Sequence, residues 1–294
     1  MQNPLFIGAA TALITPFKED GSLDLEGLKQ LIELQIENGI SAIVVAGTTG
    51  EASTLRFEEY SLLIAKSAEY INHRVPLIAG SGSNNTATAI RLSLEAEKRG
   101  ANALLIVTPY YNKTTQNGLI QHYYAIADRV SIPIILYNIP GRTGLKIEPK
   151  TCKALSVHPN IIGIKDAGNN ISETAEIAGL CNDILIYSGN DDQILPFLSL
   201  GGTGVISVLS NIAPSEVQRI CYLYQNGEPQ KALALHQKFL PLIRLLFEEV
   251  NPIPIKAAAK ELNLPCGSPR LPLVSCTDAL AKRIRKEMEK LNLI

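Results

Sequence analysis

The chain lacks an excess of charge of either sign. Its 27 Lys and Arg residues are balanced by 28 Asp and Glu residues, which gives a formal net charge of -1 at pH 7. Proteins that bind nucleic acid or anionic membranes use a basic excess to attract phosphate groups. The one basic run, KRIRKEMEK near the C-terminus, also contains acids and is typical of an exposed helix face. The composition therefore argues against a nucleic-acid or membrane-surface role.

Long apolar runs, targeting signals and cysteine motifs are also missing. No uncharged apolar run reaches the ~18 residues that span a bilayer, and the N-terminal MQNPLFIGAATALITPF has neither the basic region nor the cleavage site of a signal peptide. The cysteines are odd in number and show no CxxC or metal-ligand spacing. We therefore expect a soluble, cytoplasmic protein with reduced thiols. The five cysteines are Cys152, Cys181, Cys221, Cys266 and Cys276.

Motifs for common cofactors are absent as well. Neither GxxxxGK[ST] nor GxGxxG occurs, so the sequence does not indicate a nucleotide cofactor. The four histidines fall in predicted helical or connecting segments, away from the strand ends. We expect no metal, no organic cofactor and no histidine general base. The histidines are His73, His122, His158 and His236.

Short apolar runs are present, and they alternate regularly with longer amphipathic segments. The runs are bounded by Gly and Pro, and they are continuously apolar rather than alternating. Such runs are typical of strands that are covered on both faces, as in a parallel sheet. The predicted strands are 7–14, 42–47, 75–80, 103–108, 133–138, 161–165, 184–189 and 204–208.

The segments between these strands have helical patterns. Two of them end at a glycine that can cap a helix. The predicted helices are 25–39, 57–71, 86–100 and 117–130, with shorter ones near 149–156, 172–180, 191–199 and 214–226.

Eight successive strand–helix units predict an α/β fold, a closed parallel (β/α)8 TIM barrel. A doubly wound open sheet is the alternative, but ALITPF in the first strand is not followed by its glycine fingerprint. We assign residues 1–226 to a barrel catalytic domain. Residues 227–294 contain no convincing strand and are predicted to form a C-terminal extension of three helices, from PQKALALHQKFLPLIRLLFEEV, IPIKAAAKELN and TDALAKRIRKEMEKLN.

The stretch IIGIKDAGN (161–169) places Lys165 at the end of a predicted buried strand. Active sites of such barrels lie at the C-terminal ends of the strands. Burial disfavours the charged ammonium group, lowers its pKa and produces a neutral amine that can form a Schiff base with a carbonyl. A structural ion pair with a neighbouring acid, Asp166 being the nearest, is the alternative.

Tyr137 lies at the end of the fifth predicted strand and Arg142 in the loop after it, and this strand neighbours the strand of Lys165. A phenol at Tyr137 could pass protons during imine formation, although a core tyrosine also suits a strand end. The planar guanidinium of Arg142 could bind a carboxylate, and an exposed loop arginine without a role fits the local sequence equally well.

The second predicted strand ends in GTTGE (47–51). The hydroxyls of Thr48 and Thr49 and the backbone N–H groups of this Gly-flanked turn could bind a carboxylate. Thr and Gly also make ordinary caps and turns, and Glu51 is consistent with an acid in the first turn of a following helix. The motif alone is therefore weak.

Three of these motifs together resemble a known family. GTTGE at 47–51, YNIPGRTG at 137–144 and NIIGIKDAGN at 160–169 are similar to motifs of the dihydrodipicolinate synthase and N-acetylneuraminate lyase superfamily of class I aldolases. The resemblance covers nearly the whole chain and is greatest to the dihydrodipicolinate synthase branch. It implies condensation of pyruvate with L-aspartate 4-semialdehyde, towards diaminopimelate and lysine. It also implies a homotetramer, a dimer of tight dimers, without metal or organic cofactor.

The resemblance also assigns roles to individual residues. Lys165 would form the Schiff base with pyruvate. Thr48, Tyr137 and Tyr111 would form a hydroxyl relay for protons, with Tyr111 reaching across the tight dimer interface. The residues that would bind substrate are Thr49 for the pyruvate carboxylate, Arg142 for the semialdehyde carboxylate, and Gly189 and Ile206 as the lining of the pyruvate pocket.

One departure from the family concerns regulation. Lysine-inhibited members have histidine and glutamate in a cleft at the dimer interface. The matching positions here are Phe57, Tyr60 and Thr88, whereas Asn84 and Tyr110 are kept. Without a carboxylate for the lysine amine, this cleft predicts weak or absent feedback inhibition.

Two other functions are compatible with parts of this pattern. A sister aldolase for N-acetylneuraminate or a 2-keto-3-deoxy sugar acid would share Lys165 and Tyr137. Arg142 favours a short acidic aldehyde over a neutral sugar aldehyde, because sialate lyases tend to lack this arginine. A non-catalytic barrel that binds keto acids is the other alternative, and it would not require the full set of lysine, tyrosines and threonines.

Overall fold

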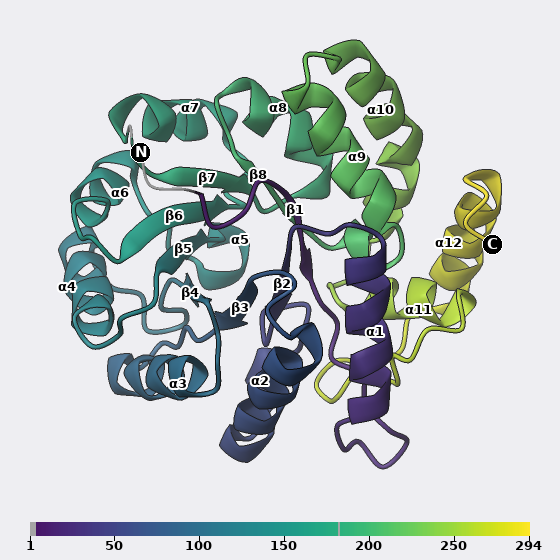
Figure 1. Cartoon of the computed structure of the whole chain (residues 1–294), viewed down its shortest axis with the longest axis horizontal. Coiled ribbons are helices and arrows are strands. Elements are labelled where there is room, and N and C mark those ends of the chain that lie inside the picture. Colours follow the sequence, from purple (N-terminus) through teal and green to yellow (C-terminus); the bar gives the residue numbers. More distant parts are fainter. Residues whose placement is uncertain (1–3, 182) are drawn as a thin grey trace.

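The computed structural model describes residues 4–181 and 183–294 and has the predicted barrel architecture (Figure 1). Eight parallel strands pair in the order β1-β2-β3-β4-β5-β6-β7-β8, and β8 pairs with β1 to close the sheet. Helices surround this barrel; of the C-terminal helices, α10 packs beside α9, and α12 packs against α10 and α11. Residues 1–3 of the N-terminal segment, where no targeting signal is expected, lie outside the described residues.

All eight predicted strands are confirmed, with ends that differ by at most two residues from the prediction. Their residues are buried almost throughout, which explains why each strand is continuously apolar. The strands are β1 (Gly8–Ala12), β2 (Ala42–Val45), β3 (Leu77–Gly80), β4 (Ala103–Val107), β5 (Ile134–Asn138), β6 (Ile161–Asp166), β7 (Leu185–Ser188) and β8 (Gly204–Ser207).

The predicted barrel helices are also present. Several begin at a side chain that caps the helix: Asp24, Asn85, Thr115 and Asn170 each accept a hydrogen bond from a backbone N–H in the first turn. The helices are α1 (Leu25–Glu37), α2 (Phe57–Ile71), α3 (Thr86–Lys98), α4 (Gln116–Ala127), α6 (Pro149–Leu155), α7 (Ile171–Leu180), α8 (Ile194–Ser199) and α9 (Pro214–Gln225).

Three short helical segments were not predicted, because none is long enough to show a helical period. They are α5 (Pro140–Thr143) and the 3-10 helices Ala52–Thr54 and Leu209–Asn211. A fourth, the 3-10 helix Asp191–Gln193, forms the start of the helix predicted near 191–199.

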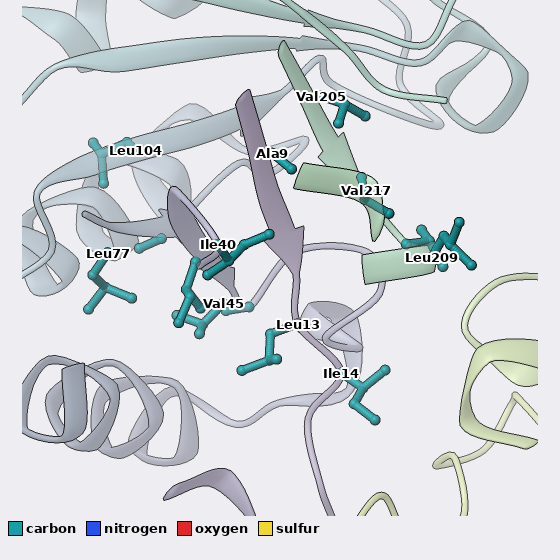
Figure 2. Packing of buried hydrophobic residues seen from close by; sticks show 14 of the residues in the cluster. Ala9, Leu13, Ile14, Ile40, Val45, Leu77, Leu104, Val205, Leu209 and Val217 are labelled. Carbon is teal, nitrogen blue, oxygen red and sulfur yellow. The ribbon is translucent and has the colours of Figure 1, made fainter. Parts of the chain in front are cut away.

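Side chains of alternate strand residues form two separate apolar layers. One layer fills the barrel and includes Ala10, Val44, Ile78, Ile135 and Ile206. The other layer lies between the barrel and its helices. Figure 2 shows part of this outer layer, which includes side chains of β1, β2, β3, β4 and β8 as well as Leu209 and Val217.

The C-terminal extension consists of α10 (Pro229–Leu245), α11 (Ile253–Glu261) and α12 (Asp278–Lys290), as predicted. In α12, Ile284 and Met288 are buried while the basic side chains around them are exposed, which confirms the exposed helix face. The expected domain boundary at 226/227 falls in the link between α9 and α10, and the division into domains stays a prediction.

No helix within residues 4–181 and 183–294 is long and apolar enough to cross a membrane.

Candidate active site

The register of three neighbouring strands places Lys165 between two tyrosines. Lys165 of β6 is paired with Tyr137 of β5 on one side and with Tyr187 of β7 on the other. Both tyrosines belong to the layer inside the barrel. Lys165 is only 5% exposed, and its Nζ lies 4.3 Å from the centroid of the Tyr137 ring. The lysine amine is therefore inside the barrel, against an aromatic face.

Asp166 is not the partner of this amine. Its Oδ1 accepts hydrogen bonds from Asn138 Nδ2 and Gly168 N, both at 2.9 Å, and its Oδ2 accepts one from Thr174 Oγ1 at 2.8 Å. None of the ion pairs within residues 4–181 and 183–294 includes Lys165. The alternative of a structural Lys165–Asp166 pair is therefore wrong, because Asp166 faces the other side of the strand and connects β5, β6 and α7.

A second buried acid, Asp191, lies close enough to Lys165 for the two side chains to interact electrostatically. Burial raises the pKa of Asp191, and hydrogen bonds together with the Lys165 charge oppose that rise. The Oδ2 of Asp191 accepts from the backbone N–H groups of Val208 and Leu209 at 3.0 and 2.9 Å. Asp191 therefore holds the backbone that follows β8 and places a buried carboxyl group near the amine.

A cavity of about 470 Å³ opens at the C-terminal ends of the strands. Thr48, Tyr137 and Arg142 line it, together with Asn251 from the extension. Arg142 belongs to α5, which begins with Pro140 at its first position, and its Nη2 donates to the carbonyl oxygen of Asn251 at 3.1 Å. The guanidinium is thus anchored at the cavity wall and does not belong to a free loop.

The turn of residues 47–51 does not have the predicted position before an α-helix. It leads into the 3-10 helix Ala52–Thr54, and α2 begins only at Phe57. Glu51 is buried and its Oε1 lies 2.5 Å from Lys256 Nζ. The interpretation of Glu51 as a first-turn acid is therefore wrong.

Thr49 is held from the C-terminal extension. Its side chain is buried, and its Oγ1 accepts a hydrogen bond from Asn251 Nδ2 at 2.9 Å. A hydroxyl that accepts one bond keeps its own proton free to donate. The bond to Asn251 therefore leaves the Thr49 hydroxyl proton unused, although Thr49 is not among the residues that line the cavity.

The remaining predicted residues lie off the cavity wall. Gly189 donates its backbone N–H to Asp166 O at 2.7 Å, and a Cβ there would come within 2.7 Å of the Ala167 Cβ. Ile206 of β8 lies in the layer inside the barrel. Tyr111 has a positive φ of 68° and is 93% exposed. The fold thus gathers Thr48, Tyr137 and Arg142 at the cavity, with Lys165 against Tyr137, while Tyr111 is exposed and is not among the lining residues.

Sequence reasoning missed Asn251, Lys256 and Asp191. Asn251 and Lys256 lie in the extension, so a search of strand ends could not find them. Asp191 stands in SGND at a strand end, and that position was the available signal. Among residues 4–181 and 183–294, no three His, Cys, Asp or Glu side chains are grouped so that they could hold a metal ion.

Comparison with known proteins gives a consistent result over the whole chain. Residues 5–291 match the model of the dihydrodipicolinate synthetase family. The 4-hydroxy-tetrahydrodipicolinate synthase of Caldicellulosiruptor saccharolyticus is 52% identical over 285 residues, 97% of each chain. That of Clostridium acetobutylicum is 50% identical over 291 residues, 99% of each chain.

Solved structures of the same kind share the fold. The dihydrodipicolinate synthase of Thermotoga maritima superposes with a TM-score of 0.97 at 40% identity, over 99% of this chain and 100% of that one. The enzyme from Aquifex aeolicus gives 0.96 at 40% identity, over 98% and 99%. The barrel, the motifs and these matches agree: the chain belongs to the dihydrodipicolinate synthetase family.

Proposed function

We propose that the protein is a lyase that condenses pyruvate with L-aspartate 4-semialdehyde, the activity of a 4-hydroxy-tetrahydrodipicolinate synthase in lysine and diaminopimelate biosynthesis. The observation that carries this proposal is the buried Lys165, which packs against Tyr137 and forms no ion pair with a carboxylate in residues 4–181 and 183–294. The relatives that carry this name are about half identical over nearly the whole chain.

The proposed chemistry begins at Lys165. Its amine adds to the pyruvate carbonyl and loses water to form an imine, which draws electrons from the methyl carbon. Loss of a methyl proton gives an enamine whose carbon attacks the aldehyde. The substrate amine then displaces Lys165 as the six-membered ring closes. Thr48, Tyr137 and Tyr111 would carry the protons in these steps.

The substrate carboxylates are assigned to two sites. Thr49, with its hydroxyl and its backbone N–H, would hold the pyruvate carboxylate. Arg142, anchored by Asn251 at the cavity wall, would bind the semialdehyde carboxylate through its planar fork. Gly189 and Ile206 would complete the pyruvate pocket from β7 and β8.

The assembly proposed for the protein is a homotetramer built from tight dimers. Tyr111 supports it. Its side chain is 93% exposed and its φ is positive, and both the exposed ring and the strained backbone would be explained if a second subunit covered this residue. A cytoplasmic location is proposed from the chemistry of the cysteines, since all five are unpaired.

Two assays test this function. Borohydride reduction in the presence of pyruvate should leave a reduced pyruvyl group on Lys165, identified by peptide mass spectrometry. A coupled assay with aspartate semialdehyde beside N-acetylneuraminate should show turnover of the semialdehyde. Turnover of the sugar alone would favour a sister aldolase, and absence of the adduct would favour a non-catalytic barrel that binds keto acids.

L-Lysine should be a weak inhibitor. Phe57, Tyr60 and Thr88 line the same cavity as Thr48, and the one acid among its described lining residues, Glu51, is already paired with Lys256. A lysine ammonium would find no free carboxylate there, so we expect a Kd weaker than about 1 mM. An inhibition curve with L-lysine checks this, and half-inhibition in the micromolar range would contradict it.

A further inference from the structure

The turn of residues 47–51 is strained. Ala46 precedes it and Glu51 ends it, and both have left-handed backbone conformations, with φ of 51° and 55°. Residues other than glycine adopt this region at a cost and keep it only where the surroundings impose it. The Ala46 backbone can lie directly against β3 only because residue 80 is a glycine: a Cβ at this position would overlap the carbonyl oxygen of Ala46.

The surroundings that hold the turn come from the C-terminal extension. Both carboxylate oxygens of Glu51 are engaged by it: Oε1 is 2.5 Å from Lys256 Nζ, and Oε2 accepts from the backbone N–H of Arg270 at 2.8 Å. Asn251, a few residues before Lys256, reaches Thr49 in the middle of the turn. The extension therefore contacts the turn at two points.

The Glu51–Lys256 pair is almost completely removed from water. The two side chains are 0% and 2% exposed, and the Lys256 amine lies 4.5 Å from the centroid of the Phe17 ring. Burial lowers the pKa of Lys256, and the Glu51 carboxylate is the main group that opposes this change. The pair is thus a buried ion pair that joins two segments far apart in the sequence.

Stability alone does not explain such a pair. Well-packed apolar side chains of the same volume often stabilise a protein as much as a buried ion pair, because desolvation cancels much of the attraction. An ion pair does fix the direction of a side chain, which an apolar contact does not. Here the fixed side chain belongs to the residue that ends the turn of Thr48 and Thr49.

We propose that Glu51 and Lys256 are positioning residues, through which the C-terminal extension holds the 47–51 turn in the shape that binds the pyruvate carboxylate. This proposal deepens the function proposed above and rests on it. A displacement of about 1 Å in a substrate-positioning group can cost as much as 10²-fold in rate. The extension would then be part of the pyruvate site, although it supplies no reacting group.

The test is the double variant Glu51→Gln/Lys256→Met, which removes both charges and keeps the approximate volumes. We expect it to fold with a Tm close to that of the unmodified protein. Its KM for pyruvate should rise about tenfold, while kcat and the KM for the semialdehyde change less than about twofold. The rate of borohydride-trapped adduct formation at low pyruvate should fall in parallel.

The matched control is Glu33→Gln/Arg74→Met. This ion pair has two short contacts, 2.6 and 2.7 Å, but it lies on the outside of the barrel, between α1 and the segment after α2. Its loss should leave all kinetic constants unchanged. Glu51→Gln alone is the second variant. It removes the carboxylate, but it is expected to keep the fold because a neutral Lys256 amine can still accept a hydrogen bond from the new amide.

The outcomes are separable. A folded Glu51 or double variant with an unchanged KM for pyruvate overturns the positioning role. If both variants fail to fold while the control folds, the pair is purely structural and the proposal is wrong. Absence of the pyruvyl adduct in the unmodified protein would overturn the proposed function itself, and this inference with it.

Discussion

A Lys165→Ala variant should fold and yet lose condensation activity by about 10⁴-fold or more, because the amine that would form the imine is gone. Lys165 has no ion-pair partner among the described residues, so its removal leaves no buried carboxylate unpaired. The variant should therefore keep its Tm within a few degrees. Borohydride treatment with pyruvate should yield no reduced adduct, and the coupled assay should show no turnover above background.

Two controls accompany this variant. Lys165→Arg keeps a cation at the site but supplies no nucleophile, because guanidinium is not deprotonated in proteins, and it should be equally inactive. Lys153→Ala removes an exposed lysine of α6 and should retain full activity. If the pyruvyl adduct persisted in Lys165→Ala, another lysine would be the nucleophile and the proposed mechanism would be wrong.

The barrel could be predicted because its determinants are local. Each strand is a short apolar run that is buried on both faces, and each is followed by a segment with helical periodicity. Such patterns are visible within windows of a few residues. The α5 segment of Pro140–Thr143 was missed for the complementary reason: one helical turn has no period to detect.

The site was only partly predictable. Placing strand ends on one rim was sufficient to gather Thr48, Tyr137 and Arg142 around one cavity. The contacts from the extension could not be foreseen, because Asn251 and Lys256 come together with residues 49–51 only after the chain has folded. Glu51 was misinterpreted for this reason, since its burial and its backbone conformation depend on a lysine about two hundred positions later.

The groups around the buried amine of Lys165 differ from those around the other buried lysine, Lys256. Among the described residues no ion pair holds the Lys165 amine; the Tyr137 ring lies 4.3 Å away, and the buried carboxyl group of Asp191, which the backbone N–H groups of Val208 and Leu209 hold in place, lies nearby. Lys256, which has a carboxylate partner at 2.5 Å, is the contrasting lysine in the same chain.

A Tyr137→Phe variant should lose turnover by about 10²- to 10⁴-fold, the range in which proton transfer by a positioned side chain contributes. The ring would still pack against Lys165, so we expect the imine still to form, though more slowly, and the KM for pyruvate to change little. The loss should appear in kcat, because the several proton transfers after binding lack the phenol. Steady-state kinetics and borohydride trapping of the imine together measure these two effects.

Tyr187→Phe is the matched control, because Tyr187 of β7 is paired with Lys165 on the side opposite to Tyr137. Its hydroxyl donates to the carbonyl oxygen of Phe6 at 3.0 Å, and its ring stacks on the Phe6 ring. Removal of that hydroxyl leaves a buried carbonyl unsatisfied and should cost about 1–3 kcal/mol of stability, with turnover largely kept. The two variants thus have opposite expected effects, one on kcat and one on the free energy of unfolding. Equal losses of kcat in both would mean that packing around Lys165, rather than the Tyr137 phenol, controls the reaction.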